Sequence, residues 1–108
     1  MATTYKVLGQ SNPAATTLTT LYTVPAATSA VCSTLTIANL NVSTTFRVAV
    51  RPAGVAIANS HYIAYDTPIN QYDSVFLTLG ISLANTDVIS VYAGTANVAF
   101  NLFGSEIA

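Results

Sequence analysis

Charged side chains are scarce in this chain of 108 residues, and their scarcity excludes several classes of function. Only 6% of the residues are charged, against about 25% in an average soluble domain. Three basic and four acidic residues give a net charge of −1, so the chain has no basic face to neutralise a row of phosphates. We therefore expect neither nucleic acid nor a membrane surface among its partners.

Cysteine and long hydrophobic runs are also scarce. The single cysteine, Cys32, cannot form an internal disulfide, so packing has to stabilise the fold. Although 52% of the residues are hydrophobic, no apolar run approaches the roughly 18–20 residues of a membrane-spanning helix. The first residues show no basic segment followed by an apolar stretch, so no secretory signal is predicted and we expect synthesis in the cytoplasm.

A chain this apolar and weakly charged is expected to be a poor free monomer at high concentration, because solubility depends on interspersed charges. Neutral surfaces of this kind are typically covered by further copies of the chain or by a partner. Composition therefore predicts a subunit of an assembly.

The residues that are abundant suit β-strands. Apolar and polar residues alternate with a period of two, most clearly over residues 45–51, where Phe46, Val48 and Val50 form one face. Similar runs occupy residues 19–24, 30–40, 74–79, 87–93 and 97–103. Turn signals separate the runs at intervals of roughly 8–12 residues, and no segment keeps a helical spacing. The sequence predicts one all-β domain over residues 1–108, an antiparallel, jelly-roll-like β-sandwich of about eight short strands.

Two of the turns predict hairpins. Residues 41–44 (NVST) follow one predicted strand and precede the next, and residues 94–97 separate the last two strands. We expect each pair of flanking strands to lie side by side in one sheet.

Residues that could support catalysis are few and scattered. His61 is the only histidine, and its neighbour Ser60 points to the opposite face of a strand. Cys32 lies in an apolar run without a base nearby, which predicts a small buried side chain rather than an activated thiolate. One histidine and one cysteine do not make a zinc site, and the glycines are too isolated for a phosphate loop. We expect a protein that is not an enzyme and that holds no metal ion or cofactor.

Three tyrosines, Tyr62, Tyr65 and Tyr72, form the best candidate binding cluster. Tyrosines of this kind favour a protein interface or a core, where the ring is buried while the hydroxyl finds a partner. The alternative is a sugar site, in which the rings stack on the sugar and Asp66 or Asn70 binds its hydroxyls.

Arg47 and Arg51 are predicted to share the strand face that points away from the core, since they alternate with its apolar residues. Their planar guanidinium groups suit carboxylates across an interface. The acidic partner would be a surface outside the chain or a residue within it, and the alternative is two solvated arginines. The candidate acidic residues within the chain are Asp66, Asp73 and Asp87.

Several stretches resemble a family of small virion proteins of tailed bacteriophages. They are residues 20–26 (TLYTVPA), 46–50 (FRVAV), 61–66 (HYIAYD), 87–93 (DVISVYA) and 100–106 (FNLFGSE). The resemblance extends from Tyr5 to Glu106 and rests on strand and turn motifs.

This resemblance implies a β-sandwich structural subunit of a phage virion, made in the host cytoplasm and binding itself and other virion proteins. A closed homo-oligomer, a dimer or a trimer, is expected. Capsid decoration is favoured over a tail or baseplate position, because the chain has no fibrous repeat or coiled coil. The alternative is a carbohydrate-binding receptor module of a tail fibre, whose partner is a host glycan.

Overall fold

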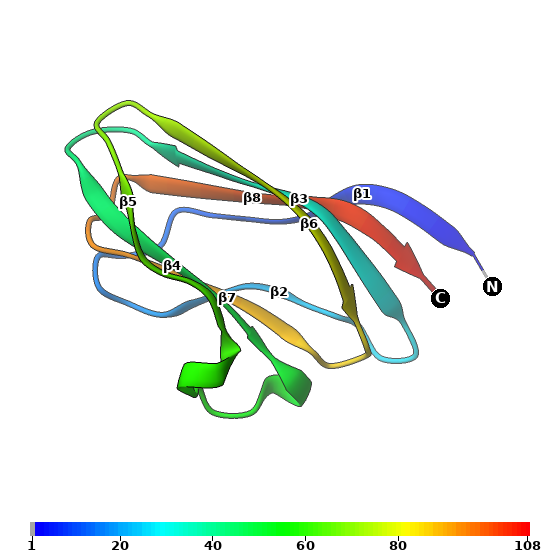
Figure 1. Cartoon of the computed structure of the whole chain (residues 1–108). Helices are drawn as coiled ribbons and strands as arrows, with labels where there is room; N and C mark the ends of the chain where they lie inside the picture. The colour runs from blue at the N-terminus through cyan, green and yellow to red at the C-terminus, as the bar shows by residue number, and fades with distance from the viewer. Residues whose placement is uncertain (1) are drawn as a thin grey trace.

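The computed structural model describes residues 2–108, apart from the side chain of Leu79, and this part of the chain is built almost entirely from β-strands (Figure 1). Two short 3-10 turns, η1 (Pro52–Gly54) and η2 (Asn59–His61), follow the fourth strand. The eight strands are β1 (Thr3–Ser11), β2 (Thr19–Thr23), β3 (Ser29–Asn39), β4 (Thr44–Arg51), β5 (Tyr62–Ile69), β6 (Ser74–Leu83), β7 (Val88–Ala93) and β8 (Val98–Ile107).

The strands form two four-stranded sheets, which pack face to face (Figure 1). Sheet 1 has the order β1-β8-β3-β6 and sheet 2 has the order β2-β7-β4-β5, with every neighbouring pair antiparallel. The pairing of β1 with β8, β2 with β7, β3 with β6 and β4 with β5 is that of one long hairpin rolled up into a sandwich, the jelly-roll arrangement. The predicted all-β sandwich is confirmed.

Both predicted hairpins are wrong. Residues 40–43 and 94–97 each carry the chain from one sheet to the other, because β3 and β8 belong to sheet 1 whereas β4 and β7 belong to sheet 2. A short polar turn followed by an alternating strand fits either geometry, since the apolar face points to the core in both. Long-range pairing, which local sequence does not encode, decides between them.

Two asparagine side chains hold these corners. The amide nitrogen of the buried Asn39 donates to the carbonyl oxygens of Val42 (2.8 Å) and Asn70 (3.0 Å), which joins the end of β3 to the β5–β6 turn. Asn12 donates in the same way to the carbonyl oxygen of Val98 (2.9 Å). Each amide replaces backbone partners that the chain loses where it leaves a sheet.

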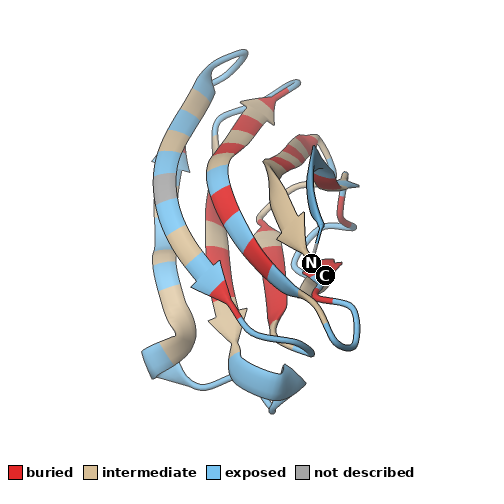
Figure 2. Cartoon of the chain, turned by 90° about the vertical axis from the view of Figure 1, so that its right-hand side faces the viewer, coloured by how far each residue is buried: buried red, intermediate tan, exposed pale blue. Residues whose placement is uncertain are grey.

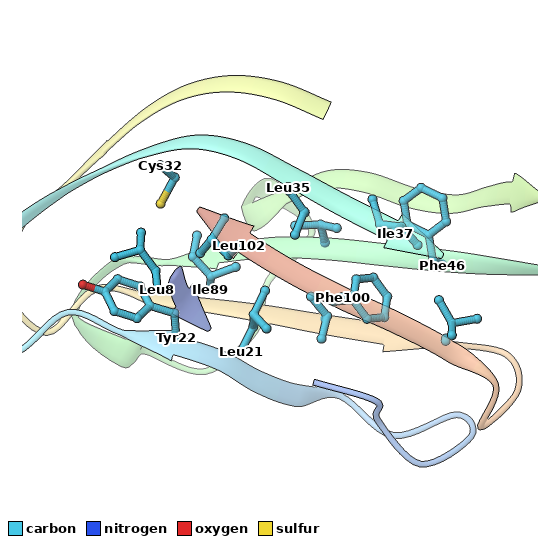
Figure 3. Packing of buried hydrophobic residues seen from close by; sticks show 14 of the residues in the cluster. Leu8, Leu21, Tyr22, Cys32, Leu35, Ile37, Phe46, Ile89, Phe100 and Leu102 are labelled. Carbon is cyan, nitrogen blue, oxygen red and sulfur yellow. The ribbon is translucent and has the colours of Figure 1, made fainter. Parts of the chain in front are cut away.

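The core lies between the two sheets. Alternate residues of each strand point inward, and Figure 2 shows the resulting alternation of buried and exposed positions. Phe46 from sheet 2 meets Phe100 from sheet 1 edge to face, with ring centroids 6.3 Å apart (Figure 3). Phe46 and Val48 are buried and Val50 packs against the core, as their alternation predicted. Cys32 is also fully buried, which confirms its interpretation as a core side chain.

Within residues 2–108 there is no helix with the length and apolar composition needed to cross a membrane.

Candidate functional site

Arg47 lies on the outer face of sheet 2, opposite a β-bulge in the edge strand β5. The register between β4 and β5 shifts around Arg47, so that Tyr65 and Asp66 both lie opposite this single residue. Asp66 has a φ of 47°, a left-handed conformation in which aspartate is found more often than most residues. The bulge leaves both Tyr65 and Asp66 exposed on the outer face beside the arginine.

The guanidinium group of Arg47 is held from three sides. Its Nε donates to Oδ1 of Asp66 at 2.6 Å, and its Nη2 donates to Oδ2 at 3.2 Å. Its Cζ atom lies 4.1 Å from the ring centroid of Tyr65 on β5 and 4.3 Å from that of Tyr92 on β7. Because β4 runs between β5 and β7, the guanidinium lies between the two rings, an arrangement that combines a bidentate ion pair with cation–π contacts.

The ion pair also fixes the charge state of both partners. The hydrogen bond from Arg47 lowers the pKa of Asp66, and the same bond raises the pKa of Arg47. The carboxylate is therefore ionised at neutral pH, and the positive charge of Arg47 is balanced within the chain.

A shallow depression lies beside this cluster, where η2 meets β5. Its volume is about 470 Å³, and it is lined by Asn59, Tyr62 and Tyr65. The two tyrosine rings meet edge to face, with centroids 4.8 Å apart and an interplanar angle of 81°. Tyr65 remains 55% exposed, so part of its ring surface faces the solvent.

Arg51 lies on the same outer face of sheet 2 and binds a segment that covers part of it. Its Nε lies 3.2 Å from Oγ of Ser90, and its Nη1 donates to the carbonyl oxygen of Val55 at 3.2 Å. These bonds hold the segment 52–61 against sheet 2, where η1 contacts β7 and η2 contacts β4. Ala49 and Ser90 are consequently buried although they lie on the outer side of sheet 2.

The outer face of sheet 1 has a different chemistry. Three rows of outward side chains cross its four strands in register, and we call them together the neutral face. The rows are Tyr5, Ser105, Val31 and Ser82; Val7, Phe103, Thr34 and Thr78; and Gln10, Asn101, Thr36 and Phe76. None of these residues is charged, and Tyr5 (84% exposed) and Phe76 (69% exposed) are the most prominent of their apolar members.

The charged residues of sheet 1 point the other way. Lys6 and Glu106 occupy rows that face the inside of the sandwich, where Lys6 Nζ lies 3.0 Å from Glu106 Oε1. The hydroxyl of Tyr22 donates to the other oxygen of Glu106 at 2.5 Å. These hydrogen bonds lower the pKa of Glu106.

The structure brings some of the predicted site residues together and leaves others apart. Arg47 and Arg51 do share the outer face, but Arg47 pairs with the predicted acidic candidate Asp66, and Arg51 binds neutral oxygens of its own chain. Tyr62 and Tyr65 come together, whereas Tyr72 lies in the β5–β6 turn, 73% exposed and outside the depression.

The remaining candidates take part in other contacts. Asp73 accepts from the backbone amide of Ser74 at its own turn, and Asp87 accepts from the backbone amides of Ala53 and Ala84. Asn70 contributes its carbonyl oxygen to Asn39. None of the three joins the tyrosines or the arginines among the contacts described for residues 2–108.

Two members of the site were missing from the sequence prediction. Tyr92 occupies an outward position of β7, and the alternation of its strand indicated that orientation, but its approach to Arg47 depends on the β4–β7 register. Asn59 has no local signal, since it lies in an irregular connection. In the part of the chain that the structure describes, no group of three histidine, cysteine or acidic residues gathers as a metal site.

Comparison of the chain with protein-family models, with curated proteins and with solved structures finds no match.

Proposed function

We propose that this protein is a non-enzymatic structural subunit of a tailed-phage virion, present in many copies that bind one another and other virion proteins. The observation that carries the proposal is the neutral face of sheet 1. It exposes aromatic and aliphatic side chains such as Tyr5 and Phe76 without any charged residue among them.

Such a face is well suited to association. Burial of apolar surface is the dominant favourable contribution to most protein–protein association, and aromatic side chains are frequent among the residues that dominate binding. No ion has to be desolvated when the neutral face is covered, and the hydroxyl and amide groups in its rows have short side chains that pair readily with a partner.

The phage assignment is supported by the resemblance of the strand and turn motifs to small virion proteins. The jelly roll is compatible with it, because viral capsid proteins use this architecture, although lectins do so as well. The extents of 44 × 27 × 19 Å describe a short block rather than a shaft, which favours a capsid decoration over a tail or baseplate fibre.

Light scattering of the purified protein over a range of concentrations tests the association. We expect a dimer or trimer that dissociates in the variants Phe76→Glu and Tyr5→Lys, because each introduces a charge that must be desolvated in the interface. The matched control is Tyr72→Glu, at an exposed tyrosine outside the neutral face, which should associate as the native chain does. A native chain that stays monomeric and does not bind purified particles contradicts the proposal.

The position on the particle is tested by antibody labelling of purified virions. Labels over the head support capsid decoration, and labels confined to the tail or baseplate refute it.

A further inference from the structure

The depression beside β5 has the size and lining of a small-molecule site. Its volume of about 470 Å³ lies within the range of roughly 300–1,000 Å³ that ligand pockets occupy. Two phenol rings and one carboxamide, from Tyr62, Tyr65 and Asn59, line it. We propose that this depression binds a neutral saccharide residue.

The first argument is that the rings are held in place before any ligand arrives. Tyr65 lies against the Arg47 guanidinium at 4.1 Å, and that group is itself held by Asp66 and Tyr92. Tyr62 is braced by its edge-to-face contact with Tyr65. A ligand that stacks on these rings therefore loses little affinity to the ordering of side chains.

The second argument concerns the polar groups. A sugar ring presents a C–H surface that packs on an aromatic ring and a rim of hydroxyl groups that both donate and accept hydrogen bonds. The Asn59 carboxamide offers a donor and an acceptor. The Asp66 carboxylate, next to Tyr65 in the chain, is 46% exposed at its side chain and keeps lone pairs beyond the two that Arg47 uses.

The third argument excludes charged ligands. An anionic sugar, a phosphate or a nucleotide needs a cation at its site, and none of the three basic residues, which all lie within the described residues 2–108, lines the depression. Arg47 is paired with Asp66, and Arg51 binds Ser90 and Val55. Lys6 is paired with Glu106 on sheet 1. Two phenol rings and a carboxamide therefore suit a neutral ligand that is rich in hydroxyl groups.

The site does not depend on the proposed assembly. The Arg47 cluster and the depression beside it belong to sheet 2, whereas the neutral face belongs to sheet 1. A subunit bound through its neutral face would leave the depression open, and saccharide binding is equally expected of the isolated chain.

Saturation-transfer-difference NMR on the isolated protein tests the inference. The probes are the methyl glycosides of glucose, galactose, mannose, rhamnose and N-acetylglucosamine at millimolar concentration. We expect saturation of the ring protons of at least one glycoside, with affinity reduced about tenfold in Tyr62→Ala and in Asn59→Ala, since each removes a group that lines the site.

Two variants control for indirect effects. Tyr62→Phe keeps the ring and should retain most of the binding. Tyr72→Ala removes an exposed tyrosine outside the depression and should bind as the native chain does.

The inference is overturned by no saturation transfer to any of the five glycosides, by transfer that is unchanged in Tyr62→Ala while its fold is retained, or by an equal loss in Tyr72→Ala. Stronger transfer to a proline-rich peptide that Tyr62→Ala abolishes also overturns it, because the depression would then be a peptide site.

Discussion

The two outer faces of the sandwich are both built from antiparallel strands, but their outward side chains have different surroundings. On sheet 2, Arg47 and Arg51 find their partners within the chain, and the segment 52–61 covers part of the sheet. On sheet 1, the neutral face leaves Tyr5 and Phe76 largely in the solvent. We call the first face closed, because its arginines bind within the chain, and the second face open, because its two most exposed rings remain in the solvent.

The difference follows from where the few charged residues lie. Of the seven, none is on the neutral face, and Lys6 and Glu106 turn inward from the strands that form it. Interspersed charged side chains usually protect a protein surface against association, and the neutral face has none. The few charged residues therefore all lie elsewhere, and the neutral face is free of charge.

The largest expected effect is on the free energy of unfolding, and it distinguishes substitutions in the shared core from substitutions on the neutral face. Phe100→Ala and Phe46→Ala each remove a fully buried ring and should lower the free energy of unfolding by about 3–5 kcal/mol. Phe76→Ala removes a ring that is 69% exposed and should change it by at most about 0.5 kcal/mol. Urea unfolding at low protein concentration measures all three. A loss for Phe76→Ala as large as that for Phe100→Ala would show that this ring stabilises the monomer rather than an interface.

A smaller effect is expected in acid. The pKa of Glu106 is lowered in the folded state by Tyr22 and Lys6, so its carboxylate stabilises the fold above the ordinary glutamate pKa of about 4.3. This contribution is lost as the pH falls through the lowered pKa. The pKa of Asp66 is also lowered, so its carboxylate likewise stabilises the fold at neutral pH and loses this contribution in acid.

Melting temperatures between pH 7 and pH 3 measure this contribution. Glu106→Gln should flatten the decline more than Asp66→Asn does, because the Glu106 side chain is 14% exposed and that of Asp66 is 46% exposed. The reverse order would contradict the view that the Glu106 carboxylate is better shielded from the solvent than the Asp66 carboxylate.

The smallest effect concerns the closed face. Arg51→Gln shortens the side chain that bridges Ser90 and the Val55 carbonyl, so the segment 52–61 should exchange its amide hydrogens faster while the strands stay protected. Hydrogen-exchange mass spectrometry measures this, and association should be unchanged. Weaker association in this variant would instead place Arg51 at an interface, as the sequence had suggested.

The positions and inward faces of six strands were predictable because they depend on local alternation, whereas no alternating run was predicted over β1 or β5, whose pairing is interrupted by register shifts. Phe46 and Val48 are buried where that alternation placed them, and Arg47 points outward. The path between strands was not predictable, since residues 94–97 would serve equally well in a hairpin or in a corner between sheets. The sheet order depends on pairings between distant segments, such as β1 with β8.

The candidate site was predictable only in part, for the same reason. Tyr62 and Tyr65 are three residues apart and would point to opposite faces of a regular strand, but the shifts in the β4–β5 register bring both rings to the outer face. Grouping Tyr72 with them ignored the turn that carries it away. The contact between Arg47 and Asp66 depends on a bulge at a residue with positive φ, which no pattern of alternating residues reveals.

The most direct test of the open and closed faces is thiol labelling of two cysteine variants. Thr78→Cys lies on the neutral face, and the matched control Thr23→Cys lies at an exposed position of sheet 2. The native thiol does not compete, because Cys32 is fully buried and burial raises its pKa to about 11. We predict that the labelling rate of Thr78→Cys falls with the fraction of free subunit as the protein concentration rises, while that of Thr23→Cys stays constant. Equal rates for the two variants at every concentration would contradict the account.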